Sequence, residues 1–132
     1  MIRIDVTCRY TETHDWVRVE GDTALLGISD FAQNQLSDIV FIELPEVGSS
    51  YEQGQVYAVV ESVKAASDCY APVNGEVIEV NSALEAEPAA VNRDPYGAGW
   101  FVRVRLANPA QLGDLRDGES YRELVRQLTE EV

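Results

Sequence analysis

Residues 55–70 read QVYAVVESVKAASDCY, and this pattern indicates both the class of fold and a candidate functional residue. Two runs rich in β-branched and aromatic residues, 56–62 and 67–70, flank a short interval, which is typical of a tight β-hairpin. Lys64 lies near the predicted tip, where its side chain is expected to be solvated and to point away from the core. An amine in such a place is suited to accept an acyl group. It is equally compatible with an ordinary surface charge, because most lysines are exposed.

Other segments concentrate or alternate β-forming residues and predict further strands: 16–20, 23–28, 39–44, 76–81 and 100–106. The Gly21-Asp22 pair between the first two indicates a second hairpin. The run that ends at Pro45 is almost continuously apolar, so we expect that strand to be buried on both faces. The last run is expected to close the sheet.

Helices are predicted in the middle of the chain and at its C-terminal end. Ser29 is a candidate N-cap for one or two helical turns over 31–36. We expect C-terminal helices over about 109–131, because Pro109 suits a first helical position. An apolar stripe with helical spacing supports the second of them: Tyr121, Leu124, Val125 and Leu128. Residues 82–96 contain several turn formers and are expected to be irregular.

Many short strands with few helices predict a mainly β fold. We expect two antiparallel sheets that form a sandwich or a flattened barrel, with a short internal helix and C-terminal helices. The 132 residues suit a single domain, 1–132, with one hydrophobic core. No glycine-rich phosphate loop connects a strand to a helix, so a nucleotide-binding site is not supported.

The chain is strongly acidic, with 10 Lys and Arg against 23 Asp and Glu and a net charge of −13. An acidic surface repels phosphate backbones, so we expect no nucleic-acid partner. No apolar run approaches the roughly 18 residues that a membrane span needs. Residues 1–5 lack the apolar core of a signal peptide, and we therefore expect a cytoplasmic protein without a membrane partner.

The few sulfur and imidazole side chains limit the chemistry of the chain. Cys8 and Cys69 have no metal-binding spacing, and free thiols are expected in a reducing cytosol. His14 is the only histidine, so no metal site and no catalytic residue are predicted. An enzyme with a site at His14 and its neighbouring carboxylates is the alternative, but it would lack a paired nucleophile and base.

The segment around Lys64 resembles the lipoyl-attachment hairpin of the glycine cleavage system H-protein family. The resemblance rests on the attachment motif and the residues after it: Glu61, Ser62, Val63, Lys64, Ala65, Asp68 and the APVNG of 71–75. Four further blocks match in the same order: YTETHDWV (10–17), GISDFAQ (27–33), DIVFIELP (38–45) and VNRDPYGAGW (91–100). Biotin carriers usually flank their lysine with methionines, and lipoyl domains of 2-oxo acid dehydrogenases usually have Asp before it. Neither pattern fits Val63 and Ala65.

The resemblance implies a lipoyl-domain-like barrel-sandwich hybrid that acts as a non-catalytic carrier, with lipoate attached to Lys64 through an amide bond. Its arm would take the aminomethyl group of glycine from glycine decarboxylase to a tetrahydrofolate-dependent aminomethyltransferase. Dihydrolipoyl dehydrogenase would then reoxidise the dithiol. Lipoylating enzymes are further implied partners, and we expect a monomer. The alternative is a similar carrier that relays lipoyl groups or sulfur intermediates to other proteins, because fold does not fix the pathway.

The aminomethyl group carries a cationic amine and is labile to water. A cavity that protects it should exclude water and offer carboxylate or hydroxyl partners. The family resemblance places these partners at Thr13, Asp15 and Asp68, with Asp15 where the family often has glutamate. Strand alternation puts Asp68 and Cys69 on opposite faces, so we expect Cys69 to be buried and inert.

Overall fold

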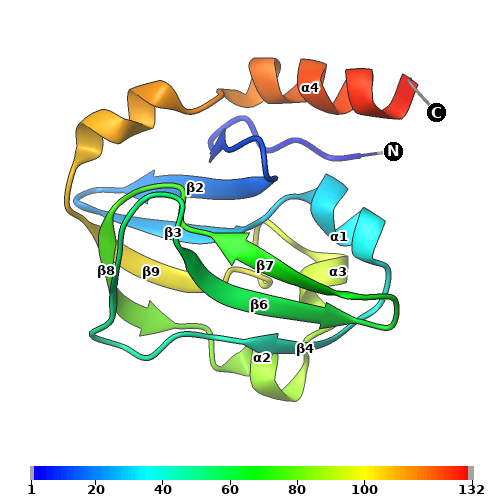
Figure 1. Cartoon of the computed structure of the whole chain (residues 1–132), viewed down its shortest axis with the longest axis horizontal. Coiled ribbons are helices and arrows are strands. Elements are labelled where there is room, and N and C mark those ends of the chain that lie inside the picture. Colours follow the sequence, from blue (N-terminus) through cyan, green and yellow to red (C-terminus); the bar gives the residue numbers. More distant parts are fainter. Residues whose placement is uncertain (1, 131–132) are drawn as a thin grey trace.

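The computed structural model describes residues 2–130, and its strands form two antiparallel sheets (Figure 1). The six-stranded sheet contains, in spatial order, β1 (Arg9–Tyr10), β2 (Asp15–Glu20), β3 (Thr23–Ile28), β9 (Val102–Leu106), β8 (Gly75–Val80) and β5 (Ser50–Tyr51). The three-stranded sheet contains β4 (Ile39–Glu43), β6 (Val56–Ser62) and β7 (Ala66–Tyr70). The prediction of a mainly β fold with two antiparallel sheets is confirmed.

Helices occupy the connections and the C-terminal end: α1 (Asp30–Leu36), α2 (Ala83–Ala86), α3 (Ala90–Arg93), the 3-10 helix η1 (Pro109–Asp114) and α4 (Gly118–Glu130). Ser29 caps α1 as predicted, because its Oγ accepts a hydrogen bond from the Ala32 N–H at 3.2 Å. The stretch predicted to be irregular contains the single turns α2 and α3. Residue 131, where the predicted C-terminal helices end, lies outside the described residues.

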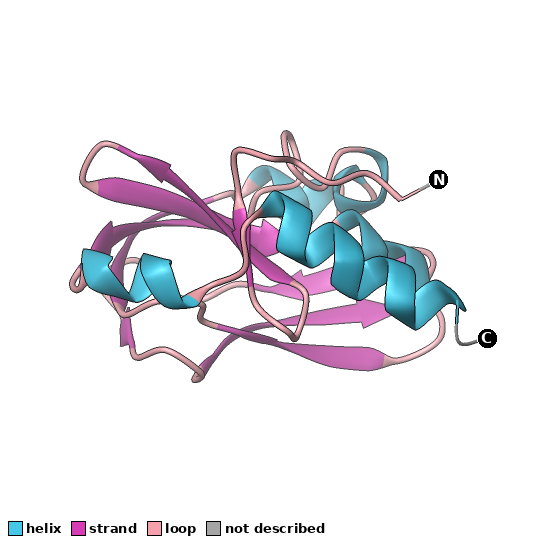
Figure 2. Cartoon of the chain, turned by 90° about the horizontal axis from the view of Figure 1, so that it is seen from above, coloured by secondary structure: helices cyan, strands magenta, loops and turns pink. Residues whose placement is uncertain are grey.

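The main core lies between the two sheets, where inward side chains of both are buried together. Leu26 and Val77 of the larger sheet and Val60 of the smaller one belong to this cluster. A second cluster, the aromatic cluster, lies between α4 and the larger sheet and contains Cys8, Tyr10, Trp16, Leu25, Phe31, Tyr96, Tyr121 and Val125. In Figures 1 and 2 α4 runs along the outside of the sheet, next to the N-terminal segment. The helix therefore completes the burial of side chains that the two sheets leave uncovered.

The prediction that the strand before Pro45 is buried on both faces is wrong. Ile39 and Ile42 of β4 are buried, whereas Val40 and Phe41 are 54% and 51% exposed. The reason is that only the inward face of the three-stranded sheet packs on the core, which leaves the other face of β4 exposed to solvent. The last predicted strand also differs from expectation, because β9 lies inside the larger sheet, between β3 and β8.

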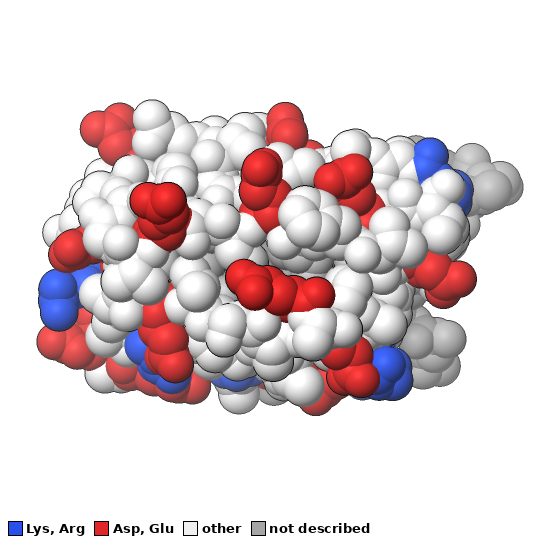
Figure 3. All heavy atoms as spheres, turned by 90° about the horizontal axis from the view of Figure 1, so that it is seen from below, with Lys and Arg blue, Asp and Glu red and all other residues white. Residues whose placement is uncertain are grey.

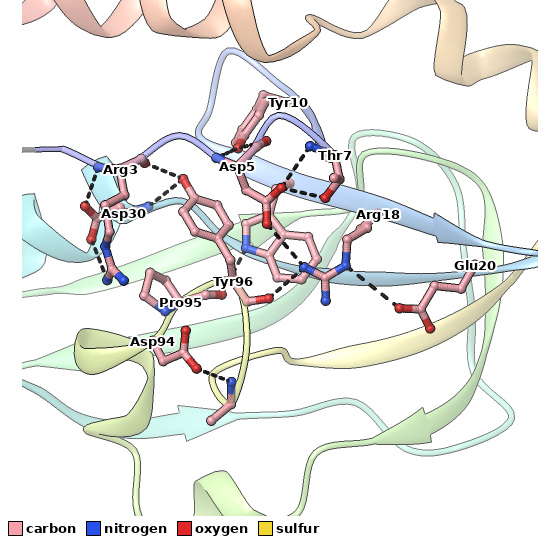
Figure 4. A network of polar contacts seen from close by, with 12 residues as sticks. Arg3, Asp5, Thr7, Tyr10, Arg18, Glu20, Asp30, Asp94, Pro95 and Tyr96 are labelled. Atoms are coloured by element: carbon pink, nitrogen blue, oxygen red, sulfur yellow. Dashed lines mark hydrogen bonds and ion pairs between the residues drawn. The ribbon is translucent and has the colours of Figure 1, made fainter.

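A network of polar contacts fixes the N-terminal segment against the loop after α3 (Figure 4). The Tyr96 hydroxyl donates to the Arg3 carbonyl at 2.9 Å and accepts from the Asp30 N–H at 3.1 Å. Arg18 donates to the Tyr96 carbonyl at 2.7 Å. Residues 2–5 are thereby held beside the aromatic cluster. No helix within residues 2–130 is long and apolar enough to cross a membrane.

Candidate functional site

Lys64 lies in the turn that joins β6 to β7, and hydrogen bonds within the turn fix its backbone. The Ser62 N–H donates to the Ala65 carbonyl at 2.8 Å. The Ser62 Oγ accepts from the N–H groups of Lys64 and Ala65, both at 3.1 Å. The last strand pair before the turn is Glu61 with Ala66. Residues 62–65, called the hairpin tip below, are therefore a well-defined turn.

The hairpin tip is also attached to the body of the protein, next to α1 (Figure 1). The Val63 N–H donates to the Asp38 carbonyl at 3.0 Å. The Lys64 side chain is exposed, and its Nζ donates to the Gln35 carbonyl at the C-terminal end of α1 at 3.2 Å. The tip thus presents an accessible amine on a fixed backbone.

A second group of site candidates lies in the turn before β2, residues 11–15, called the threonine turn below. Asp15 is only 2% exposed. Its carboxylate accepts hydrogen bonds from Thr13 Oγ1 at 2.7 Å and from Thr11 Oγ1 at 3.3 Å. The main-chain N–H of Tyr70, at the end of β7, also binds this carboxylate. The threonine turn is therefore joined to the strand that starts at the hairpin tip.

Burial raises the pKa of Asp15 from its ordinary value of 3.8 to about 7, although the hydrogen bonds from Thr13, Tyr70 and Thr11 act in the opposite direction. Desolvation dominates because the charged form of a carboxyl loses more hydration than these donors restore. The carboxyl therefore titrates near neutral pH, and a cation close to it would favour its ionised form.

A groove of about 380 Å³ opens beside the threonine turn, and its surface is mainly apolar. Its lining residues are Thr11, Glu12, Thr13, Gln53, Gly54, Tyr70 and Ala71. Lys64, Asp15 and Asp68 do not line it. Asp68 is exposed on β7 between the hairpin tip and the groove. Asp68 and Tyr70 lie on one face of β7, because alternate residues of a strand do. The structure thus brings Thr13 and Asp15 into contact and places Asp68 apart from them.

Both cysteines are free, as predicted, and both are buried, which was predicted for Cys69 alone. Cys69 is opposite in orientation to Asp68 along β7, and burial raises the pKa of its thiol well above the ordinary value, with the charges of Asp15 and Asp68 acting in the same direction. A thiol with a raised pKa is a poor nucleophile. The expectation of a buried, unreactive Cys69 agrees with this environment.

Two residues of this region were not predicted from the sequence. Thr11 organises the threonine turn, since its Oγ1 accepts from the N–H groups of Asp15 at 3.1 Å and Thr13 at 3.3 Å. The Thr-x-Thr spacing is a signal of such a turn and was available in the sequence. Tyr121 was assigned only to an apolar stripe, but its hydroxyl lies 2.8 Å from His14 Nδ1. No local pattern predicts that contact.

One face of the protein, seen from below relative to Figure 1, is strongly acidic. Figure 3 shows Asp and Glu distributed over one face, with Lys and Arg mainly near its margins. Among residues 2–130, no group of three or more His, Cys, Asp and Glu side chains is placed to hold a metal ion.

Comparison with known proteins decides the family. Residues 8–128 match the glycine cleavage H-protein family model. The chain belongs to this family. It is 56% identical to the glycine cleavage system H protein of Parvibaculum lavamentivorans over 120 residues, which cover 91% of this chain and 96% of the relative. The H protein of Xanthobacter autotrophicus is also 56% identical, over 117 residues that cover 89% of this chain and 94% of that one.

The solved structures agree. A crystal structure of an H protein from Mycobacterium marinum matches with a TM-score of 0.84 and 36% identity, over 92% of this chain and 98% of that chain. Membership of the H-protein family makes the chain a lipoyl carrier in glycine cleavage and not an enzyme. Lipoate, held covalently on a lysine, is the cofactor of this family. The hairpin tip suits that group, because it offers an exposed amine on a fixed turn.

Proposed function

We propose that Lys64 is the residue to which lipoate is attached through an amide bond. Lys64 is the only lysine of the chain, and its exposed Nζ is accessible to a lipoylating enzyme. When bound, lipoate supplies a disulfide and dithiol that accept and release the aminomethyl group. The protein itself supplies attachment, orientation and shelter.

The neighbours of Lys64 are proposed to form the attachment motif, each with a different part. Ser62 fixes the turn through its Oγ. Val63 is 65% exposed and offers an apolar contact beside the amine. Glu61 is exposed and offers an acidic contact to a modifying enzyme. Ala65 adds little bulk next to the lysine. A lipoylating enzyme would recognise this shape as a whole.

Thr13, Asp15 and Asp68 are proposed to receive the aminomethyl end of the arm. The groove beside Thr13 has apolar walls that reduce contact of the cargo with water. The buried carboxyl of Asp15 would ionise next to an ammonium group, because an opposite charge favours its charged form. Asp68, exposed on β7 between Lys64 and the groove, would attract the same cation along the way.

The proposed partners are glycine decarboxylase, aminomethyltransferase, dihydrolipoyl dehydrogenase and lipoylating enzymes, acting on a monomer that forms a single carrier domain over 1–132. The net charge of −13 favours partners with basic rims and would speed transient encounters with them. The bacterial relatives support a cytoplasmic setting.

Reconstitution with the cognate partner enzymes tests the proposal. The lipoylated chain should support glycine-dependent formation of NADH, and Lys64→Arg should reduce it to background, because arginine keeps the charge but cannot form the amide. A lipoylated chain that loads normally yet supports no glycine-dependent turnover would favour the alternative relay role. Turnover by the Lys64→Arg variant would contradict the attachment site.

A further inference from the structure

The hydroxyl of Tyr121 connects the C-terminal helix to the threonine turn. Tyr121 lies in the first turn of α4 and is 0% exposed. Its Oη is 2.8 Å from His14 Nδ1 and 2.6 Å from Ser29 Oγ. Its ring stacks on Tyr10 with centroids 4.1 Å apart. The aromatic stack holds the ring in place, so the position of its hydroxyl is well defined.

His14 has an unfavourable backbone conformation that needs external support. Its φ of 71° lies in the left-handed region, which costs a residue with a Cβ about 1–2 kcal/mol. Its carbonyl accepts from the Ser29 N–H at 2.9 Å, and its ring packs on Phe31 with centroids 4.7 Å apart. Because His14 lies between Thr13 and Asp15, its conformation sets the direction of both side chains.

One assignment of hydrogens gives both hydroxyl groups a hydrogen-bond partner. Burial lowers the pKa of His14, which favours a neutral ring at pH 7. The Tyr121 hydroxyl then donates to Nδ1, and the Ser29 hydroxyl donates to Tyr121 while its Oγ accepts from the Ala32 N–H. Each hydroxyl thus donates to a partner. The contact between Tyr121 and His14 is therefore a directed hydrogen bond that restrains His14, in addition to a packing contact.

We infer that Tyr121 is a positioning residue of the carrier: from α4 its hydroxyl fixes His14, and through His14 it holds Thr13 and Asp15 in the arrangement that shelters the ammonium group of the cargo. The inference rests on the proposed roles of Thr13 and Asp15. It gives the C-terminal helix, which lies outside both sheets, a part in protecting the arm.

Two tyrosine-to-phenylalanine variants separate this role from general stability. Tyr121→Phe removes the hydroxyl and keeps the stacked ring. Tyr96→Phe is the matched control, because Tyr96 belongs to the same aromatic cluster but its hydroxyl binds Arg3 and Asp30. In the unlipoylated protein, amide hydrogen exchange over residues 11–15 should become about fivefold faster in Tyr121→Phe, the equivalent of one hydrogen bond. Amide exchange over the same residues should stay unchanged in Tyr96→Phe.

The lifetime of the cargo provides the second measurement. Reduced lipoyl protein is loaded with formaldehyde and ammonium, and release follows R–S–CH₂–NH₃⁺ + H₂O → R–SH + CH₂O + NH₄⁺. Intact mass without partner enzymes should show release about fivefold faster in Tyr121→Phe than in wild type, and an unchanged rate in Tyr96→Phe. His14→Asn, which tolerates the left-handed conformation, breaks the same contact from the other side. The double variant with Tyr121→Phe should be no faster than either single variant.

The outcomes are distinct. Equal exchange and equal release in wild type and Tyr121→Phe would overturn the inference alone, as would an equal acceleration by Tyr96→Phe. A wild-type protein that accepts no lipoate would overturn the proposed function, and the inference with it.

Discussion

The hairpin tip and the threonine turn are both turns beside β7, but they are stabilised in different ways. At the tip, the contact of Ser62 with Ala65 joins residues three apart in the chain. At the threonine turn, the contact of His14 with Tyr121 joins residues 107 apart. The tip leaves its lysine exposed, whereas the threonine turn buries its aspartate. A carrier needs both, because the attachment residue must be reached by enzymes and the cargo must be kept from water.

This difference implies that substitutions in the two regions lower the free energy of unfolding by unequal amounts. Contacts within a short exposed turn contribute little to global stability, whereas buried contacts between distant elements contribute a large share of it. Changes in and around the threonine turn should therefore destabilise the protein, whereas changes at the tip should cost about 1 kcal/mol or less and act chiefly on lipoylation.

Tyr121→Ala should have the largest effect. The substitution removes a fully buried aromatic ring and leaves a cavity under α4, so the free energy of unfolding should fall by about 3–5 kcal/mol. Urea denaturation at neutral pH measures it. A loss below about 1 kcal/mol would mean that the helix contributes little to the support of the threonine turn.

Asp15→Asn should change the pH dependence of stability. The pKa of Asp15 is about 7 in the folded protein and 3.8 by its ordinary value, so the folded state retains a proton that the unfolded state releases between these values. This carboxyl therefore contributes most to the free energy of unfolding below pH 3.8. Its contribution falls by ~4 kcal/mol in total as the pH rises from 3.8 to about 7.

The asparagine variant lacks this proton and serves as the reference. The wild type should lose stability relative to it as the pH rises through this range, with no further change at higher pH. Denaturation curves at several pH values measure the difference. A difference that is independent of pH would contradict the raised pKa.

Much of the tip was predictable from the sequence, because the hydrogen bonds that define its turn are local. The two β-rich runs around Lys64 predict the hairpin, and the Ser29 cap predicts α1. The exposed face of β4 was mispredicted, since an apolar run does not reveal whether one or both faces of its strand are covered. The support of His14 by Tyr121 was not predictable either, because it depends on how α4 packs on the sheet.

Ser62→Ala tests the local support of the tip. The variant loses the Oγ that accepts from Lys64 and Ala65, which should cost about 1 kcal/mol or less because the turn is exposed. Amide exchange at the two N–H groups should accelerate, and lipoylation by the modifying enzyme should slow down. Unchanged exchange at both positions would show that other contacts define the turn.

Val63→Ala should have the smallest effect on stability. Its side chain is 65% exposed and makes no core contact, so the free energy of unfolding should stay within about 0.5 kcal/mol of the wild type. A larger loss would remove the contrast between the tip and the threonine turn. The rate of lipoylation is the readout that should fall if Val63 belongs to the recognised motif.

The attachment of lipoate to Lys64 is tested most directly by intact mass spectrometry after co-expression with a lipoylating enzyme. The wild type should carry one lipoyl group, and Lys64→Arg, which keeps the charge and the fold, should carry none. Since the chain has no other lysine, no second side-chain amine competes for the group. An adduct that persists in Lys64→Arg, or an unmodified wild type under conditions that lipoylate a control carrier, would contradict the account.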